Sequence, residues 1–380
     1  ATSVIYGCHL LQMNSAETVC FLKARSILPV IVLIGQPARI NKIGTSFNFY
    51  MSHKVYSRRK FIKQNSIACL GTSLGVAVSS SLFANFLPLA QTVQPEEDEP
   101  IIDIHQHTHY SGRNDQLLLA HQRAMGITTT ILLPAGRSVI SASTHYGESN
   151  GLEAEAGGND ACYKFAQDHP GEFTFGACEV PDIPGAIVEI EKYLKLGAKV
   201  IGELKFGVEC DAKPMQKIYK LAEAYNVPVL MHWQFKKYNY SFKKFHKMLK
   251  KYPKVNFLGH AQTWWANVDR EHKDQNILYP NTKVTPGGLT DRLLSDYPNM
   301  FGDLSAGSGL NFFTRDEDHT KAFLQRHQDK LIYGSDCSDR IGQGPECQGS
   351  QTIAAIRRLS ANKLIERKLL FENAKKIFRL

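Results

Sequence analysis

Residues 101–107 read IIDIHQH, a short apolar run that ends in two histidines. The run is typical of a β-strand, and alternate residues of a strand share one face, so His105 and His107 are expected to point the same way. Two imidazoles placed in this manner can bind one metal ion. The HxH pattern alone is a weak signal, however, and its meaning depends on what the rest of the chain places beside it.

Similar short runs alternate with helical patterns as far as the C-terminal end of the sequence. Eight strands are expected, over residues 101–107, 127–133, 173–178, 199–206, 228–232, 255–260, 300–304 and 331–336. Helical patterns cover residues 115–125, 159–167, 185–196, 214–225 and 242–250, and Gly or Pro marks many of their ends. This alternation predicts an α/β protein with a single (β/α)8 TIM barrel over residues 101–380. A doubly wound open sheet is the alternative, but it would not explain why polar residues collect where strands end.

Four further predicted strands end in side chains of metal-binding type. Their residues are Glu203, His232, His260 and Asp336, and each follows an apolar run. Barrel enzymes carry their catalytic residues at the C-terminal ends of the strands, where side chains from different strands converge. Together with the first-strand pair, these residues predict a metal centre of His105, His107, Glu203, His232, His260 and Asp336.

Imidazole and carboxylate ligands suit Zn²⁺, with Mn²⁺, Fe²⁺ and Ni²⁺ as alternatives. Such an ion lowers the pKa of a bound water from 15.7 to about 7. Asp336 is expected to accept the proton of that water and pass it to the leaving group, while His260 either binds a second ion or polarises the substrate carbonyl. Lys205, Trp233 and Arg340 stand next to these residues in the sequence and are predicted to bind an anionic or aromatic substrate.

This set of residues resembles the amidohydrolase superfamily, in detail its amidohydrolase-related (family 2) metal-dependent hydrolases. The matching positions are the HxH of His105 and His107, the strand-five His232, the strand-six His260 and the strand-eight Asp336. The ending FENAKKIF (residues 371–378) resembles the family's C-terminal Asn-Ala-x-x-x-Phe helix. Gly-Glu-Leu at 202–204 differs from the carboxylated lysine of binuclear members. It is similar to Gly-Glu-Ile of the TatD-type deoxyribonucleases, where the glutamate is a ligand. Whether Glu203 binds metal or orients a ligand, and whether one or two ions bind, are left open.

The resemblance implies hydrolysis of a small-molecule amide, lactone or ester. One alternative is metal-dependent decarboxylation of an aromatic or unsaturated acid, although most dihydroxybenzoate decarboxylases replace the first-strand histidine pair. Another is a TatD-like phosphodiesterase or deoxyribonuclease, which Glu203 favours. Against it, residues 91–380 hold 36 Lys/Arg and 35 Asp/Glu, so that this part has no basic field for nucleic acid. A binding module without enzymatic activity would have no use for an intact ligand set.

The basic excess lies in the first 90 residues, where residues 57–63 read SRRKFIK and resemble a twin-arginine export signal. An uncharged stretch follows at 66–90. It is long enough for a membrane anchor, but its low hydrophobicity favours a cleaved signal. We therefore expect a non-native, disordered upstream segment (1–50), a signal peptide from Met51 to residue 90, and an acidic linker (91–100) before the barrel.

The export signal predicts a periplasmic or extracellular protein. The expected partners are a small-molecule substrate and, during export, the twin-arginine translocase. No nucleic acid is expected, and the sequence is compatible with a homodimer.

The remaining histidines and the cysteines are not expected to take part. His109 extends the pattern to HxHxH and is interpreted as a solvated loop residue, and we expect His121, His319 and His327 at the surface of helices or loops. Five of the eight cysteines follow residue 100. Their odd number, their irregular spacing and the lack of a CxxC pair argue against a disulfide framework and against a structural zinc site.

Overall fold

The computed structural model describes residues 99–136, 148–149, 151 and 155–380, together with three strands nearer the start of the chain. It divides the chain into two compact units, residues 1–90 and residues 91–380. The predicted signal peptide and residues 91–98 of the predicted linker lie outside the described residues.

The described strands of the first unit form a small antiparallel sheet in the order β1-β2-β3. Their bounds are β1 Cys8–Met13, β2 Glu17–Leu22 and β3 Val32–Leu33. Cys8 pairs with Leu22 and Met13 with Glu17, which sets the register of the hairpin. The assignment of residues 1–50 to an upstream segment and of 51–90 to a signal peptide stays a prediction.

The described residues of the second unit include eight short parallel strands, each within a range expected from the sequence. They are β4 Ile102–Gln106, β5 Thr129–Leu132, β6 Phe173–Phe175, β7 Ile201–Leu204, β8 Val229–His232, β9 Phe257–His260, β10 Met300–Asp303 and β11 Leu331–Ile332. β4 to β6 pair in sequence order, and so do β7 to β11.

Backbone contacts join the two sets of strands into a closed barrel. Beyond β6, Ala177 pairs with Ile201 of β7. On the other side, the Ile104 N–H of β4 donates to the Tyr333 carbonyl that follows β11 (3.3 Å), and the Asp336 N–H donates to the His105 carbonyl (2.7 Å). The predicted (β/α)8 barrel is confirmed, and the strand edges are closed on themselves.

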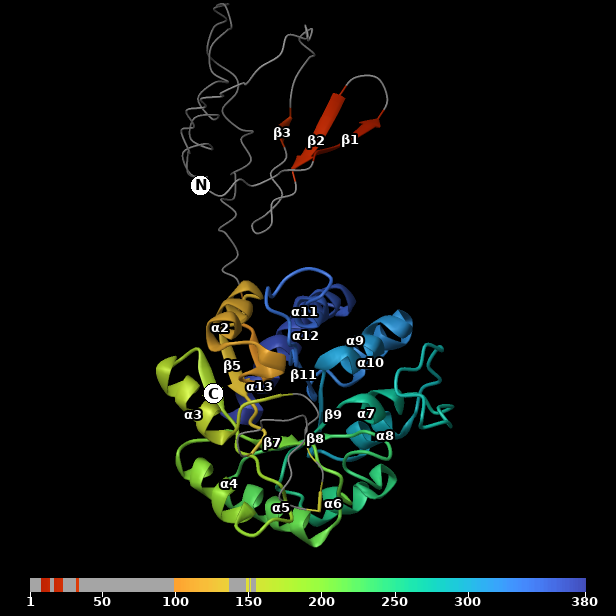
Figure 1. Ribbon diagram of the computed structural model, residues 1–380. Helices are drawn as coiled ribbons and strands as arrows, with labels where there is room; N and C mark the ends of the chain where they lie inside the picture. Colours follow the sequence, from red (N-terminus) through yellow and green to blue (C-terminus); the bar gives the residue numbers. More distant parts are fainter. Residues whose placement is uncertain are drawn as a thin grey trace, which may run out of the picture. The chain divides into compact units, whose positions relative to one another are not determined.

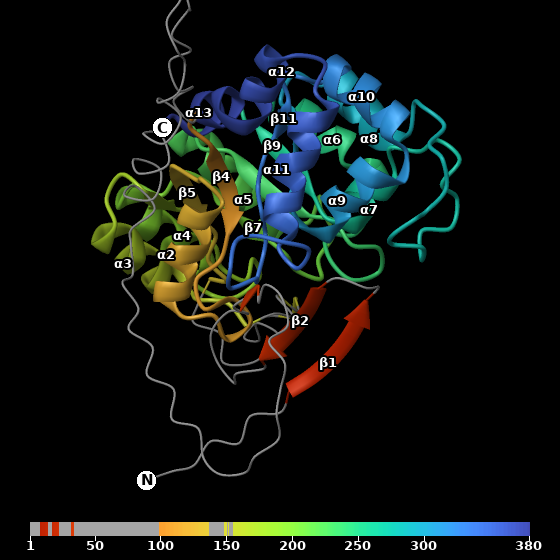
Figure 2. The ribbon, with the colours of Figure 1, turned by 90° about the horizontal axis from the view of Figure 1, so that it is seen from above.

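The helices surround the strands on all sides (Figure 1). Their bounds are α2 Asp115–Ala124, α3 Asn159–Asp168, α4 Ala186–Lys195, α5 Lys213–Tyr225, α6 His246–Lys251, α7 Gln262–Ala266, α8 Leu289–Asp296, α9 Ala306–Arg315, α10 Glu317–Arg326, α11 Gln348–Leu359, α12 Lys363–Arg367 and α13 Asn373–Phe378. Short turns of other helix types are η1 Tyr110–Gly112, η2 Phe242–Lys244 and η3 Lys368–Glu372. Seen from above, α2 to α4 lie on one side of the strands and α7 to α10 on the other (Figure 2).

The core has two layers, one inside the barrel and one between strands and helices. Alternating residues of the strands fill the inside; they include Ile131, Leu230, Leu258, Phe301 and Ile332. Side chains of α13 belong to the same cluster. The Asn373 side-chain amide donates to the Leu331 carbonyl at the start of β11 (2.8 Å), so α13 covers the N-terminal end of the barrel. The opposite end is therefore the one left for a site. Among the described residues, no helix is long and apolar enough to cross a membrane.

Candidate metal centre

The strand pattern that fills the barrel also brings the predicted ligands together. Leu230 and Leu258 point inward, and the next inward positions on their strands are His232 and His260, at the C-terminal ends of β8 and β9. These two residues are direct neighbours in the register of the pair. All six predicted ligands are buried: His105, His107, Glu203, His232, His260 and Asp336.

His105 and His107 reach the same centre because β4 is irregular. Ile102 and Ile104 both belong to the inner core, and simple alternation would turn His105 outward. The register with β5 shifts between Asp103 and Gln106, which lets both imidazoles face the barrel mouth. Their Nε2 atoms are 3.3 Å apart, so they share a face as predicted.

The other ring nitrogen of three histidines is held by a hydrogen bond. Such a bond fixes the orientation of the ring and leaves the remaining nitrogen for a metal. The contacts are His105 Nδ1 to Asp303 Oδ2 (2.7 Å), His107 Nδ1 to the Leu133 carbonyl (2.7 Å) and His260 Nδ1 to Ser305 Oγ (2.9 Å).

Glu203 lies among the four imidazoles. It belongs to β7, whose register with β8 shifts between Ile201 and Leu204. Its Oε1 is 2.5 Å from His232 Nδ1 and 3.5 Å from His260 Nε2. Its Oε2 is 3.7 Å from His105 Nε2 and 3.6 Å from His107 Nε2. Two groups that could hold a metal ion thus share this carboxylate, one with His105 and His107 and one with His232 and His260.

Asp336 closes the centre from the loop after β11. Its Oδ1 is 3.5 Å from His107 Nε2, and its Oδ2 is 3.5 Å from His260 Nε2. The hydrogen bond from its N–H to the His105 carbonyl ties this loop to the end of β4.

The polar atoms at this centre fit a cation. His232 Nε2, His260 Nε2 and Asp336 Oδ1 are buried and have no hydrogen-bond partner among the described residues. Leaving a buried polar atom unsatisfied costs about 1–3 kcal/mol. Nitrogen and carboxylate lone pairs from several strands that meet at one point are the donor set of a divalent transition metal.

The two central carboxylates carry negative charge at neutral pH. Burial disfavours the charged form of Asp336, but the imidazoles of His105, His107 and His260 outweigh it and hold its pKa well below the usual range. Burial likewise acts against the charge of Glu203, and His232 and Lys205 nevertheless keep its pKa well below its usual value.

The pKa values of two of the histidines are shifted in opposite directions. Burial, assisted by the charge of Lys205, lowers the pKa of His232 to about 4, so its ring is neutral and able to bind a metal. His105 is also buried, which disfavours its charged form, but Asp336 and Asp303 outweigh this effect and raise its pKa well above 6.5. Without a metal, His105 therefore holds a proton that a metal ion would have to displace.

A cavity of about 210 Å³ opens beside the centre and is suited to a small molecule. His232, His260 and Asp336 form part of its wall. The other lining residues are Tyr110, Lys205, Ala261, Gln262, Tyr279, Ala306, Gly307, Ser308 and Gln348. Burial and the charges of Asp336 and Glu203 raise the pKa of Tyr110 well above its usual value, so its hydroxyl stays protonated.

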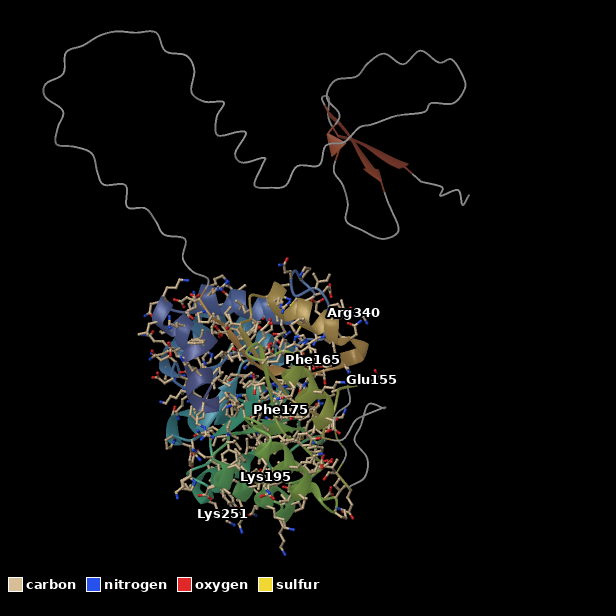
Figure 3. All side chains as sticks on the ribbon, turned by 90° about the vertical axis from the view of Figure 1, so that its left-hand side faces the viewer. Glu155, Phe165, Phe175, Lys195, Lys251 and Arg340 are labelled. Carbon is tan, nitrogen blue, oxygen red and sulfur yellow. The ribbon has the colours of Figure 1, made fainter. Side chains whose placement is uncertain are left out.

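The structure separates the three predicted substrate-binding residues. Lys205 lines the cavity. Trp233 follows His232 and therefore points to the other face of the strand, where its ring packs against Phe242 and Phe245 at 4.9 Å. Arg340 is exposed on the loop between β11 and α11 and does not line the cavity (Figure 3). The substrate contacts predicted for Trp233 and Arg340 find no support in these positions.

Asp303, Ser305 and Tyr110 were missed by the sequence argument. Asp303 ends β10, so the rule that picked out the other strand ends could have identified it. Its role is to hold His105 rather than to face the cavity. Tyr110 and Ser305 lie just after strands and carry no signal of their own.

The other histidines divide into two groups. His109 is exposed beside Asp115, as expected for a solvated loop residue. The prediction that His121, His319 and His327 lie at the surface is wrong, because all three are buried. His121 and His319 belong to the buried faces of α2 and α10, and the ring of His327, just after α10, pairs with Asp291 (2.7 Å).

No family model matches the chain, and no curated protein matches it either. Among solved structures, the chain is similar to an uncharacterized TIM-barrel protein from Bordetella bronchiseptica, with 14% identity and a TM-score of 0.51 over 74% of this chain and 99% of that one. It is also similar to a probable 2-pyrone-4,6-dicarboxylic acid hydrolase from Acinetobacter baumannii with citric acid bound (15% identity, TM-score 0.49, 74% and 99% covered). A 2,6-dihydroxybenzoate decarboxylase from Rhizobium follows (13% identity, TM-score 0.47, 74% and 99% covered). At this level of identity the likeness shows the fold, which is that of the Bordetella protein.

Proposed function

We propose that this chain is a metal-dependent hydrolase of the amidohydrolase superfamily that cleaves a small-molecule amide, lactone or ester. The observation that carries this proposal is that three residues lining one cavity have unsatisfied buried atoms: His232 Nε2, His260 Nε2 and Asp336 Oδ1. The cavity lies at the C-terminal ends of barrel strands, where this fold supports catalysis.

The ligands we assign are His105 and His107 with Glu203, and Glu203 with His232 and His260. Asp336 faces both groups. Both groups include Glu203, so these residues could hold one or two ions, and Zn²⁺ is the ion we expect from the nitrogen and oxygen donors. When bound, the metal supplies a water of lowered pKa and a Lewis-acid contact for a carbonyl oxygen.

Asp336 is the proposed general base. It is a carboxylate at neutral pH, it lines the cavity, and its Oδ1 has no hydrogen-bond donor among the described residues. It can therefore accept a proton from the attacking water and return it to the leaving group. The Tyr110 hydroxyl remains protonated beside it and can donate a hydrogen bond to a bound substrate.

Lys205 gives the cavity its substrate preference. Lys205 lines the cavity, and its Nζ is 5.5 Å from the Tyr238 ring centre. A cavity of this size accepts a small molecule, and a lysine on its wall favours one with a carboxylate or another anionic group. We therefore propose an anionic carbonyl compound as substrate.

The proposal is tested with a panel of small amides, lactones and esters, with and without a carboxylate, given to the metal-loaded chain. We expect hydrolysis of an anionic member, loss of activity after chelation and recovery with Zn²⁺ or Mn²⁺. Release of CO₂ from aromatic or unsaturated acids without any hydrolysis would replace the proposal with the decarboxylase alternative. Metal-dependent cleavage of DNA alone would favour the phosphodiesterase alternative.

We also propose that the protein is exported through the twin-arginine translocase and acts in the periplasm or outside the cell. One support is the sequence of residues 57–63, which resembles a twin-arginine signal. In addition, the twin-arginine route exports proteins that are already folded, which suits an enzyme that acquires its metal in the cytoplasm. The proposed substrate is a small molecule and not a nucleic acid.

A further inference from the structure

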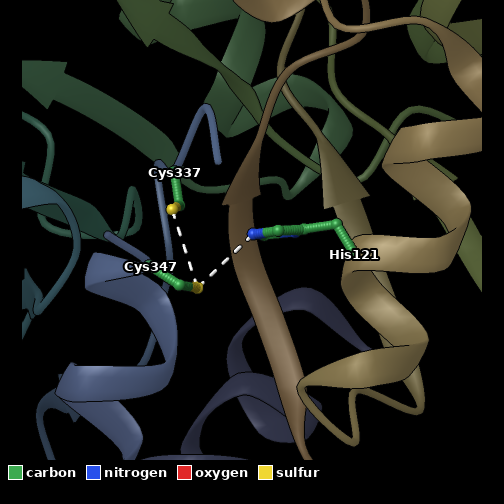
Figure 4. A group of neighbouring side chains, drawn as sticks. All are labelled: His121, Cys337 and Cys347. Carbon is green, nitrogen blue, oxygen red and sulfur yellow. Dashed lines mark hydrogen bonds between the residues drawn. The ribbon is translucent and has the colours of Figure 1, made fainter. Parts of the chain in front are cut away.

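A second group of metal-binding side chains lies outside the barrel, between α2 and the start of α11. It consists of His121 of α2, Cys337 of the loop after β11, and Cys347 immediately before α11 (Figure 4). All three are buried, with exposed fractions of 0, 1 and 0%. The centre described above uses none of them.

We propose that His121, Cys337 and Cys347 bind a structural Zn²⁺ ion. The three ligand atoms lie within 4.8 Å of one another. A tetrahedral Zn²⁺ ion with ordinary bond lengths places two sulfurs about 3.8 Å apart and a sulfur and a nitrogen about 3.6 Å apart. The measured Sγ–Sγ distance is 3.9 Å, and His121 Nε2 is 3.5 Å from Cys347 Sγ. Two edges of the tetrahedron are thus already present.

Asp339 lies beside this second site, where its Oδ2 also accepts the N–H groups of Ile341 (2.9 Å) and Gly342 (2.7 Å), and we assign the fourth position to this carboxylate or to a water. Its Oδ2 is 3.9 Å from His121 Nε2, against about 3.4 Å for the nitrogen–oxygen edge of a zinc tetrahedron. Met125 Sδ is also close, 3.6 Å from Cys347 Sγ, but a thioether is a ligand for Cu(I) rather than for Zn²⁺. A carboxylate beside two thiols and an imidazole favours zinc.

The surroundings hold this site in place. The buried Arg113 guanidinium donates to the carbonyls of Cys337 (2.9 Å) and Asp339 (2.8 Å), which fixes the loop after β11. Cys347 is the N-cap of α11, and its Sγ accepts the Ser350 N–H (3.4 Å). A helix N-terminus favours a thiolate, the form of cysteine that binds a metal.

A zinc ion here would join α2 to the loop after β11 and to the start of α11, which are more than 200 residues further along the sequence. Cys337 directly follows Asp336, so the ion would also hold the loop that carries the proposed base. The two sulfurs are 3.9 Å apart, whereas a disulfide needs about 2.05 Å, so both cysteines are free thiols in this structure.

Cobalt substitution tests the proposal because it separates the two sites. The full-length chain is stripped of metal, refilled with Co²⁺ under a non-thiol reductant, and examined by absorption spectroscopy. A thiolate bound to Co²⁺ gives an intense near-ultraviolet charge-transfer band. Imidazole and carboxylate ligands give none, so the histidine-rich centre does not contribute. We expect the band in the wild-type chain, where no substitution can have disturbed folding.

Variants then assign the band. Cys347→Ser should lose at least half of it, because one of two thiolates is removed, and the Cys337→Ser/Cys347→Ser chain should lose it entirely along with one equivalent of metal. Cys210→Ser is the matched control, since Cys210 is equally buried but donates to the Ser241 carbonyl elsewhere, and it should keep the full band. A cobalt-loaded wild-type chain without the band, or an unchanged band in the double variant, would overturn the proposal. Neither result would affect the proposed hydrolase.

Discussion

At the scale of single residues, we assign two roles to Asp336, as a metal ligand and as the general base. One of its carboxylate oxygens faces His107 and the other faces His260. Asp336→Asn keeps an oxygen that can coordinate but removes the proton acceptor. We expect turnover to fall by about 10²–10⁴-fold while most of the metal remains bound. His232→Ala should instead lose metal and activity together. Near-normal turnover of metal-loaded Asp336→Asn would show that the base is another residue.

His105 makes metal binding dependent on pH. Its pKa is raised well above 6.5 in the metal-free protein, so from pH 6.5 up to that raised pKa the ring holds a proton that metal must displace. Metal affinity should therefore rise with pH in this window, by up to about tenfold per pH unit for one proton. Calorimetry in two buffers of different ionisation enthalpy measures the released proton. A flat affinity without proton release would contradict this assignment.

Asp303→Asn also tests the link between metal binding and the His105 proton, because Asp303 is the residue that contacts His105 Nδ1. The proton release should shrink, and metal affinity should fall about 10–100-fold because the ring is less well oriented. Asp291→Asn is the matched control, as Asp291 forms an equivalent contact with His327 far from the centre.

At this scale, the residues that meet at the candidate metal centre were visible in the sequence, but the residues that hold them in place were not. His105, His107, Glu203, His232 and Asp336 each end or follow an apolar run, and that is visible in the sequence. The directions in which the Trp233 and Arg340 side chains point could not be read from the sequence, because adjacency in the sequence does not place two side chains on one face.

At the scale of elements, all eight strands lie where the apolar runs predict them. The register shifts in β4 and β7 could not be predicted, because bulges depend on how neighbouring strands pair rather than on local composition. Both shifts occur at predicted ligands, at His105 and Glu203, which is where the strands depart from simple alternation. The helical pattern at 242–250 is split into η2 and α6.

β9 offers a test of how closely α7 packs against the barrel wall. A Cβ at Gly259 would meet the buried Trp264 ring at 2.4 Å, so Gly259→Ala should lower the free energy of unfolding by about 1–3 kcal/mol. Gly307→Ala, in α9, is the control: its nearest neighbour is the flexible Gln348 side chain at 3.3 Å, and a change within about 0.5 kcal/mol is expected. Urea unfolding measures both, and equal midpoints would contradict the packing.

At the scale of the whole molecule, the barrel was predictable because strands and helices alternate with punctuation at their ends. The cluster of His121, Cys337 and Cys347 was not predictable. His121 is more than 200 residues from the two cysteines in the sequence, and it is brought to them only when the barrel closes. The absence of a CxxC pair from the sequence therefore does not exclude a metal site formed by these three residues.

Export is the prediction that concerns the whole chain and its leader. A chain that starts at Met51 should be exported and trimmed near Ala90, and Arg58→Lys with Arg59→Lys should retain it in the cytoplasm. Lys63→Arg keeps the charge outside the arginine pair and should be exported normally. Cell fractionation measures the distribution, and unchanged export in a strain lacking the twin-arginine translocase would refute the signal.

The most direct test of the central claim is the metal content of the purified chain with and without its first-strand histidines. Wild-type protein should hold at least one more equivalent of divalent transition metal than His105→Ala/His107→Ala. His109→Ala should match the wild type, because His109 continues the same pattern but is exposed. The difference is independent of any ion at the cysteine cluster, which all three proteins share. Equal metal content in the wild type and the double variant, after chelation and refilling with Zn²⁺ or Mn²⁺, would show that this barrel holds no metal at its mouth.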